Sequence, residues 1–83
     1  MAKAQHTTTY ILLPQQLRLL RENAGLTQRE LGKKLRKPQS WVYNCETANR
    51  RVDVTEFILW CRACDADPME AFGQINDQLK RSR

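Results

Sequence analysis

Three cysteines and one histidine are the residues of this sequence whose types could hold a metal ion or do thiol chemistry. Cys61 and Cys64 stand in a Cys-x-x-Cys spacing, while Cys45 and His6 stand apart. A structural zinc ion needs four ligands. A redox site of the thioredoxin type needs a strand followed by a helix, which the residues around Cys61 do not predict. We therefore expect free thiols that fill the core in a reducing compartment, and no bound metal.

The sequence has few groups that could carry out catalysis. His6 has no nucleophile near it in sequence, and the chain has no glycine-rich phosphate loop. No pair of carboxylates stands in a predicted pocket, and an enzyme needs such groups held together. We therefore expect neither an enzyme nor a cofactor.

The charge balance points to a different activity. The 83 residues hold 14 Lys and Arg against nine Asp and Glu, which gives a net charge of +5. Residues 1–51 carry ten basic and three acidic residues, whereas residues 52–83 carry four basic and six acidic residues. A positive half beside a mildly negative half predicts a polyanionic partner on one face.

Length and hydropathy limit the fold and the location. The chain has the size of one small domain with a modest core. Its longest apolar runs, at residues 10–13 and 57–61, are far shorter than the ~20 residues that cross a bilayer. The first ten residues lack the apolar segment of a secretion signal. We therefore expect a cytoplasmic protein with no membrane contact.

Apolar spacing and capping residues predict five short helices. Thr27 and Glu30 form a T-x-x-E capping box, in which each side chain bonds the backbone N–H of the other residue. Asp53 and Glu56 stand at the same spacing, and Gly73 leaves the length of the last helix open. The expected helices cover residues 14–24, 28–35 and 38–47, and two more begin at residues 53 and 67. The predicted fold class is therefore all-α, with a very short turn between the second and third helices.

Several short motifs follow one another in a fixed order between residues 17 and 72. They are GLTQREL at residues 25–31, PQS at residues 38–40, Val42, Glu46, RRVD at residues 50–53 and DP at residues 67–68. In this order and spacing the chain resembles the Cro/CI-like helix-turn-helix proteins, the XRE family. The resemblance implies a compact five-helix, lambda-repressor-like DNA-binding domain over residues 13–79. Residues 1–12 would then form an N-terminal tail, and residues 80–83 a basic C-terminal tail.

Three residues depart from the pattern of that family. Arg36 stands in the turn between the second and third helices, and Ala48 stands just after the third helix. The family usually has Gly at both positions, and another residue adopts a positive φ only at a cost. Tyr43 occupies a position in the third helix that is usually Ser or Thr. These departures leave the fold in place and affect the surface that would meet DNA.

The resemblance implies that the helix at residues 38–47 lies in the major groove of DNA, which is about 12 Å wide and admits one helix. The implied base-reading residues are Gln39, Ser40, Tyr43 and Asn44. The amides of Gln39 and Asn44 each offer a donor and an acceptor for the N6/N7 edge of adenine. Ser40 can bond a base or a phosphate, and Tyr43 can touch a thymine methyl group or bond a phosphate.

The resemblance also implies a set of contacts to the DNA backbone. Gln28 matches a family position that bonds a phosphate, and the free N–H groups at the start of its helix add to that anion site. The implied phosphate contacts are Thr27, Gln28, Lys37, Trp41, Arg50 and Arg51. For each basic residue the alternative is a plain solvated surface position. Arg21 and Glu46 match a family ion pair that joins the first helix to the end of the third and orients the recognition helix.

A group of apolar residues in the C-terminal half predicts a contact surface. The expected interface residues are Leu59, Trp60, Phe72, Ile75 and Leu79. Exposed apolar patches usually mark interfaces. We favour a homodimer, because a two-fold dimer reads two half-sites about one helical turn apart. The alternative for Trp60 is that its ring covers a thin core.

Two functions of different classes are open at this point. The resemblance implies a sequence-specific transcription regulator, a dimeric repressor that reads a palindromic operator in double-stranded DNA. Its size is typical of a phage or plasmid regulator or of a controller protein. The alternative is an antitoxin-like module whose apolar C-terminal patch holds a protein partner, with DNA binding secondary.

Overall fold

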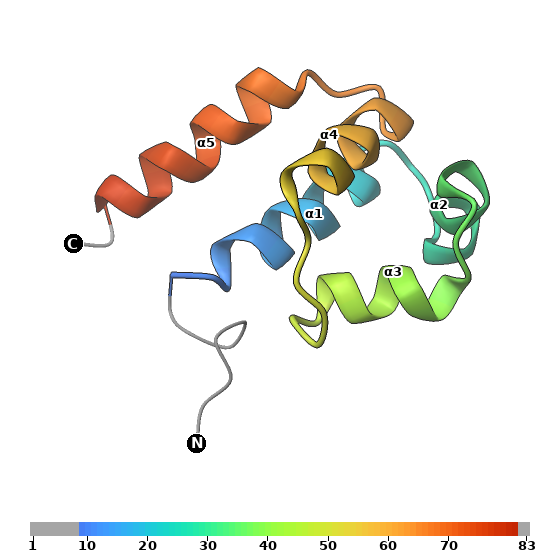
Figure 1. Ribbon diagram of the computed structural model, residues 1–83. Coiled ribbons are helices and arrows are strands. Elements are labelled where there is room, and N and C mark those ends of the chain that lie inside the picture. Colours follow the sequence, from blue (N-terminus) through green and yellow to red (C-terminus); the bar gives the residue numbers. More distant parts are fainter. Residues whose placement is uncertain (1–8, 82–83) are drawn as a thin grey trace.

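The computed structural model describes residues 9–81 and consists of five α-helices joined by short connections (Figure 1). The helices are α1 (Leu12–Asn23), α2 (Gln28–Leu35), α3 (Gln39–Glu46), α4 (Val54–Ala63) and α5 (Pro68–Arg81). Residues 9–81 contain no strand. The predicted all-α fold of five helices is therefore confirmed.

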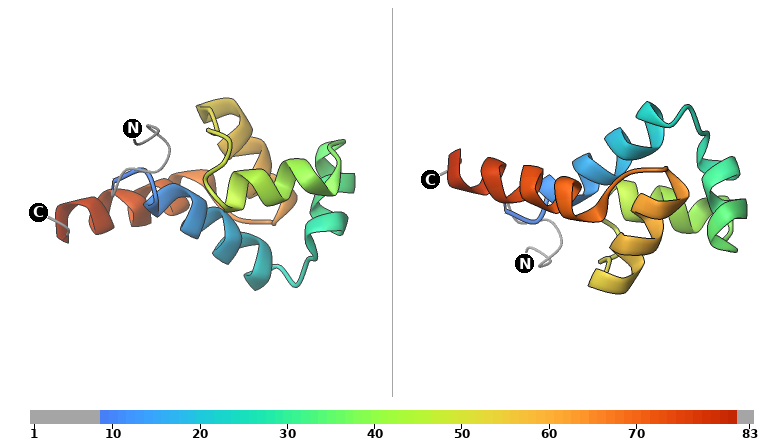
Figure 2. Two further views of the ribbon diagram at one scale, coloured as in Figure 1. Left: turned by 90° about the horizontal axis from the view of Figure 1, so that it is seen from below. Right: turned by 90° about the horizontal axis from the view of Figure 1, so that it is seen from above.

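The helices are arranged so that one side of α3 remains uncovered. α1 packs against α3, α4 and α5, and α2 packs against α3 and α4. Figure 2 shows that no helix crosses in front of α3 when the molecule is seen from below. In the view from above, α4 and its connection to α5 overlap α3 instead. Within residues 9–81, the outer side of α3 is thus not covered by another helix.

Both predicted capping boxes are present. The Thr27 hydroxyl accepts a hydrogen bond from the Glu30 backbone N–H at 3.0 Å, and the Glu30 carboxylate accepts one from the Thr27 N–H at 2.9 Å. Asp53 and Glu56 make the same exchange at 2.8 and 3.0 Å. Each box satisfies two backbone donors that a helix N-terminus leaves free, so α2 and α4 begin where the sequence predicts.

The first helix begins earlier than predicted, and the structure gives the length of the last helix, which the sequence left open. α1 begins at Leu12 rather than residue 14, because its chain is already turned by bonds from Leu12 and Leu13 N–H to the carbonyls of Thr9 and Tyr10. Pro14 is tolerated there because it falls in the first turn. α5 continues through Gly73 to residue 81, so its last two residues extend past the predicted domain end at 79. Residues 1–8, with His6, and residues 82–83 lie outside the described part of the chain.

The core lies where the five helices converge, and α5 contributes Ala71 to it. Its fully buried side chains include Leu17, Leu31, Val42, Cys45, Trp60 and Cys61. Trp60 has no exposed surface, and its indole N–H donates to the Leu17 carbonyl at 3.0 Å. The expectation that Trp60 belongs to an exposed patch is therefore wrong. Its large ring fills the centre of a small core, and its one polar atom has a partner there.

At two positions where the chain departs from the family pattern, the backbone still has the conformation that favours glycine. Arg36 has φ 58° and Ala48 has φ 65°, both in the left-handed region that favours glycine. Gly32, which the sequence analysis did not single out, is required for a different reason. A Cβ atom on Gly32 would lie 2.6 Å from the Lys37 carbonyl oxygen. The Lys37 N–H donates back to the Gly32 carbonyl at 2.8 Å, so glycine permits the close turn between α2 and α3.

Candidate nucleic-acid interface

α3 presents a polar face to solvent and an apolar face to the core. Val42 and Cys45 are buried, whereas Gln39, Ser40 and Tyr43 are exposed. Asn44 is half-buried at the edge of the same outer face. The structure therefore brings the four expected base-reading side chains together on the uncovered side of α3.

An ion pair ties the C-terminal end of α3 to α1. The Arg21 guanidinium donates to both carboxylate oxygens of Glu46, at 2.6 and 3.1 Å, and to the Leu26 carbonyl at 2.7 Å. Only 3% of the Glu46 side chain is exposed. Hydrogen bonding to Glu46 raises the pKa of Arg21 above its ordinary value, so the guanidinium stays charged. Two parallel bonds to a planar guanidinium fix orientation as well as distance, which suits the positioning of a helix.

Gln28 joins this ion pair to the start of α3. Its amide nitrogen donates to a Glu46 carboxylate oxygen at 3.0 Å, and its amide oxygen accepts from the Gln39 amide nitrogen at 2.6 Å. Arg21, Glu46, Gln28 and Gln39 thus form one continuous chain of side-chain hydrogen bonds. The family resemblance implies a phosphate contact for Gln28, and the structure adds a bond to each of its amide atoms.

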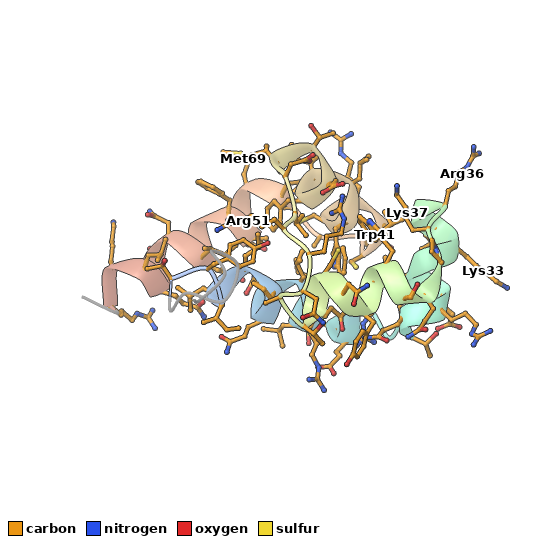
Figure 3. All side chains as sticks on the ribbon, turned by 60° about the horizontal axis from the view of Figure 1, so that its bottom comes forward. Lys33, Arg36, Lys37, Trp41, Arg51 and Met69 are labelled. Atoms are coloured by element: carbon orange, nitrogen blue, oxygen red, sulfur yellow. The ribbon has the colours of Figure 1, made fainter. Side chains whose placement is uncertain are left out.

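Trp41 is the centre of a second cluster beside α3. Its half-buried ring packs against Trp60, with 6.2 Å between ring centroids. The Lys37 ammonium lies 5.3 Å from the Trp41 ring centroid and the Arg50 guanidinium 4.9 Å from it, within the range of cation–π attraction. Figure 3 shows Lys37 beside Trp41, while Lys33 and Arg36 extend outward from the end of α2. This cluster places positive charge next to the outer face of α3.

Arg50 is held in place by bonds within the protein. Its guanidinium makes two 2.9 Å bonds to the Glu56 carboxylate and donates to the Arg51 carbonyl at 2.8 Å. Hydrogen bonding from Arg50 holds the pKa of Glu56 below its ordinary value. The same contact raises the pKa of Arg50. Arg50 therefore braces the loop between α3 and α4 against the start of α4.

Tyr10 supports the same loop, although it falls within the predicted N-terminal tail. Its hydroxyl accepts a hydrogen bond from the Val52 N–H at 2.9 Å, and the Arg51 guanidinium lies 4.5 Å from its ring centroid. Arg51 is exposed on the loop that leaves the end of α3 (Figure 3). Apart from the aromatic ring of Tyr10, no local sequence signal predicts this role, because its partners are about 40 residues away in sequence.

The apolar residues expected at an interface do not form one surface. Phe72 and Ile75 line an apolar groove of about 190 Å³ together with Leu13, Val52, Val54 and Phe57. Val54 is 74% exposed and Phe72 is 61% exposed at this groove, and Leu79 lies one turn further along α5. Leu59 lines a separate groove with Lys34, Arg36 and Arg62, and Trp60 is in the core. The remaining candidate surface is thus the groove between α4 and α5.

The cysteines are buried, as predicted. Cys45, Cys61 and Cys64 are free thiols, and burial raises the pKa of each to about 11. A thiol with such a pKa is a poor nucleophile and a poor metal ligand at neutral pH. Within residues 9–81, no group of three or more His, Cys, Asp or Glu residues is placed to hold a metal ion. None of the helices in this range is long and apolar enough to span a bilayer.

Comparison with known proteins identifies the family. A family model described as a helix-turn-helix domain matches residues 13–71. The structure is similar to that of an XRE-family like protein from Pseudomonas syringae pv. tomato, with 38% identity and a TM-score of 0.80 over 88% of this chain and 89% of that chain.

A second solved structure shares the fold at lower identity. The clp gene regulator ClgR from Corynebacterium glutamicum gives 20% identity and a TM-score of 0.76, over 88% of this chain and 95% of that one. No curated protein matches closely enough to add to these comparisons. The chain therefore belongs to the helix-turn-helix family and is an XRE-like DNA-binding protein.

Proposed function

We propose that this protein is a sequence-specific transcription regulator that binds an inverted repeat as a homodimer and represses transcription. One observation supports the proposal. Four polar side chains lie on the uncovered face of a helix, and a largely buried ion pair holds the C-terminal end of that helix. Such a helix fits the major groove and meets base edges with its N-terminal residues. The proposed function includes neither catalysis nor a cofactor.

The proposed base contacts follow from the position of each side chain. Gln39 stands at the first turn of α3, where a recognition helix approaches the bases most closely. Asn44 offers the same amide chemistry about one turn later, and both match the N6/N7 edge of adenine. Ser40 and the half-exposed Tyr43 lie between them and add contacts to a base, a thymine methyl group or a phosphate.

The proposed backbone contacts surround this helix. They are Thr27, Gln28, Lys37, Trp41, Arg50 and Arg51. Lys37 is the exposed cation of the Trp41 cluster, and the first N–H groups of α2 add a partial positive charge. Arg50 serves chiefly to position the loop, because its guanidinium already bonds Glu56.

The groove between α4 and α5 supports the dimer. Its apolar side chains gain most when a second copy covers them. The loop from the end of α3 leads to this groove, so a second copy would sit beside α3 and leave its outer face open (Figure 1). Two α3 helices in such a pair would face the same side of a DNA duplex. This arrangement fits a palindromic operator, whose half-sites are related by the same two-fold symmetry.

The same groove also favours a second candidate function. An antitoxin-like module would use it to hold a different protein. Light scattering at micromolar concentration separates the two. A clean dimer supports the regulator, and a monomer that captures one partner in equal amount supports the module.

In-vitro selection from a random DNA library, repeated at two salt concentrations, tests the regulator. We expect enrichment of an inverted repeat with half-sites about 10 base pairs apart. We also expect binding to weaken as salt rises, because phosphate contacts release counterions. Salt-sensitive binding without an enriched sequence would overturn the proposal.

A further inference from the structure

Four side chains from three helices form a hydrogen-bond chain that ends at the first residue of α3. Arg21 donates to Glu46, Gln28 donates to Glu46 at 3.0 Å, and Gln39 donates to Gln28 at 2.6 Å. The Glu46 end is buried with its charge paired, whereas the Gln39 end is exposed. The chain therefore connects a buried carboxylate to a side chain on the outer face of α3.

The chemistry of Glu46 dictates the direction of every bond in this chain. An ionised carboxylate only accepts hydrogen bonds, and a guanidinium only donates them. Gln28 must therefore turn its amide nitrogen toward Glu46, which leaves its amide oxygen facing Gln39. Gln39 must then turn its own nitrogen toward Gln28. An amide has no intrinsic preference between its two orientations, so the charge on Glu46 is what selects one.

We propose that Glu46, paired with Arg21, is a positioning residue that sets which way the Gln39 amide faces the bases. The proposal rests on the proposed function of Gln39 as a base reader. In the selected orientation, Gln39 retains its amide oxygen and one N–H for a base edge. Adenine offers an N6 donor and an N7 acceptor in one order, and a reversed amide would set donor against donor and acceptor against acceptor.

Replacing Glu46 by Gln reverses the chain. The oxygen of the new amide stays at the 2.6 Å position beside the Arg21 Nε, because a second donor there would face Arg21 at short range. Its nitrogen then takes the place of the oxygen that Arg21 Nη2 contacts at 3.1 Å, so this second bond to Arg21 is lost and the nitrogen donates to Gln28. Gln28 turns its nitrogen toward Gln39, and the Gln39 oxygen becomes the acceptor. We expect the preference for adenine at the Gln39 position to fall about tenfold.

Nuclear magnetic resonance of the DNA-free protein tests the direction without relying on DNA recognition. In the wild type, coupling across the hydrogen bond should join the Gln39 side-chain nitrogen to the Gln28 side-chain carbonyl carbon. In Glu46→Gln it should join the Gln28 nitrogen to the Gln39 carbonyl carbon. Arg21→Lys is the matched control, because it weakens the same ion pair but keeps the carboxylate, and its coupling should match the wild type. A wild-type direction in Glu46→Gln overturns the proposal.

Competition binding measures the consequence for recognition. Each variant is tested on the site enriched by the wild type and on versions that replace the adenine opposite Gln39. We expect Arg21→Lys to keep the adenine preference and Glu46→Gln to lose it. Gln28→Met breaks the hydrogen-bond chain but keeps both Arg21 and Glu46, and we expect it to lose the adenine preference as well. This variant tests the proposal if Glu46→Gln does not fold. Equal preference in all variants overturns the proposal. No adenine preference in the wild type would instead refute the proposed function of Gln39 as a base reader. The magnetic resonance couplings would still test the direction of the Gln28–Gln39 hydrogen bond.

Discussion

Arg36 and Ala48 hold backbone conformations that glycine adopts at least cost. Both have positive φ, yet their surroundings differ, because Arg36 is exposed and Ala48 is buried. A substitution of Arg36 changes the backbone preference and one surface charge. At Ala48 the methyl group also fills space in the core. Of these two positions, Arg36 is therefore the one where the cost of a left-handed residue can be measured without a change in the core.

We predict that Arg36→Gly stabilises the protein. A left-handed conformation costs an ordinary residue about 1–2 kcal/mol, and the added freedom of glycine in the unfolded chain offsets about 0.5–1 kcal/mol of that gain. The net increase in the free energy of unfolding should be about 0.5–1 kcal/mol by urea denaturation. Arg36→Ala is the control, because it removes the same charge but keeps the Cβ atom. Equal stability of the two variants would refute the conformational argument.

At the scale of elements, the turn between α2 and α3 depends on a residue inside α2 rather than on the turn itself. Gly32 lies in a helix, where glycine is normally unfavourable. The sequence predicted both helices and the capping box of α2, because those signals are local. It could not show that the Lys37 carbonyl approaches Gly32, since that contact depends on how two helices are set against each other.

We predict opposite results for alanine at two helical glycines. Gly32→Ala should destabilise the protein by about 1–3 kcal/mol, because the new Cβ atom would meet the Lys37 carbonyl oxygen at 2.6 Å. Gly73→Ala should stabilise it by about 0.5–1 kcal/mol, because nothing lies within 4 Å of the new atom. Thermal and urea denaturation compare the two. Similar effects of both substitutions would show that close packing at Gly32 does not matter.

The loop between α3 and α4 should respond to acid through Glu56. Arg50 lowers the pKa of this carboxyl in the folded protein, so its contribution to stability is present above the ordinary glutamate pKa. That contribution is lost as the pH falls through the folded value. We expect the difference in Tm between the wild type and Glu56→Gln to be largest near neutral pH and to shrink below about pH 4. A Tm difference that stays constant from pH 7 to pH 3 would contradict this assignment.

At the scale of the whole molecule, the family resemblance predicted the fold and the Arg21–Glu46 ion pair, while the contacts to bases and phosphates stay predictions. The four expected readers and the Arg21–Glu46 pair lie together as the resemblance implied. The expected interface was divided, because Leu59 and Trp60 are neighbours in sequence but lie on different sides of α4. The second role of Gln28 was missed because its partners come from both ends of α3. Burial and long-range bonds of this kind require the packed structure.

We propose that the outer face of α3 reads sequence while nearby cations bind any DNA. Competition between the enriched site and random DNA measures both properties for each variant. We expect Asn44→Ala to lower the ratio of specific to random affinity about tenfold. We expect Lys37→Ala to weaken both affinities alike and to reduce the dependence on salt by about one counterion. Equal losses on both DNAs in both variants would contradict the claim that α3 is the recognition helix.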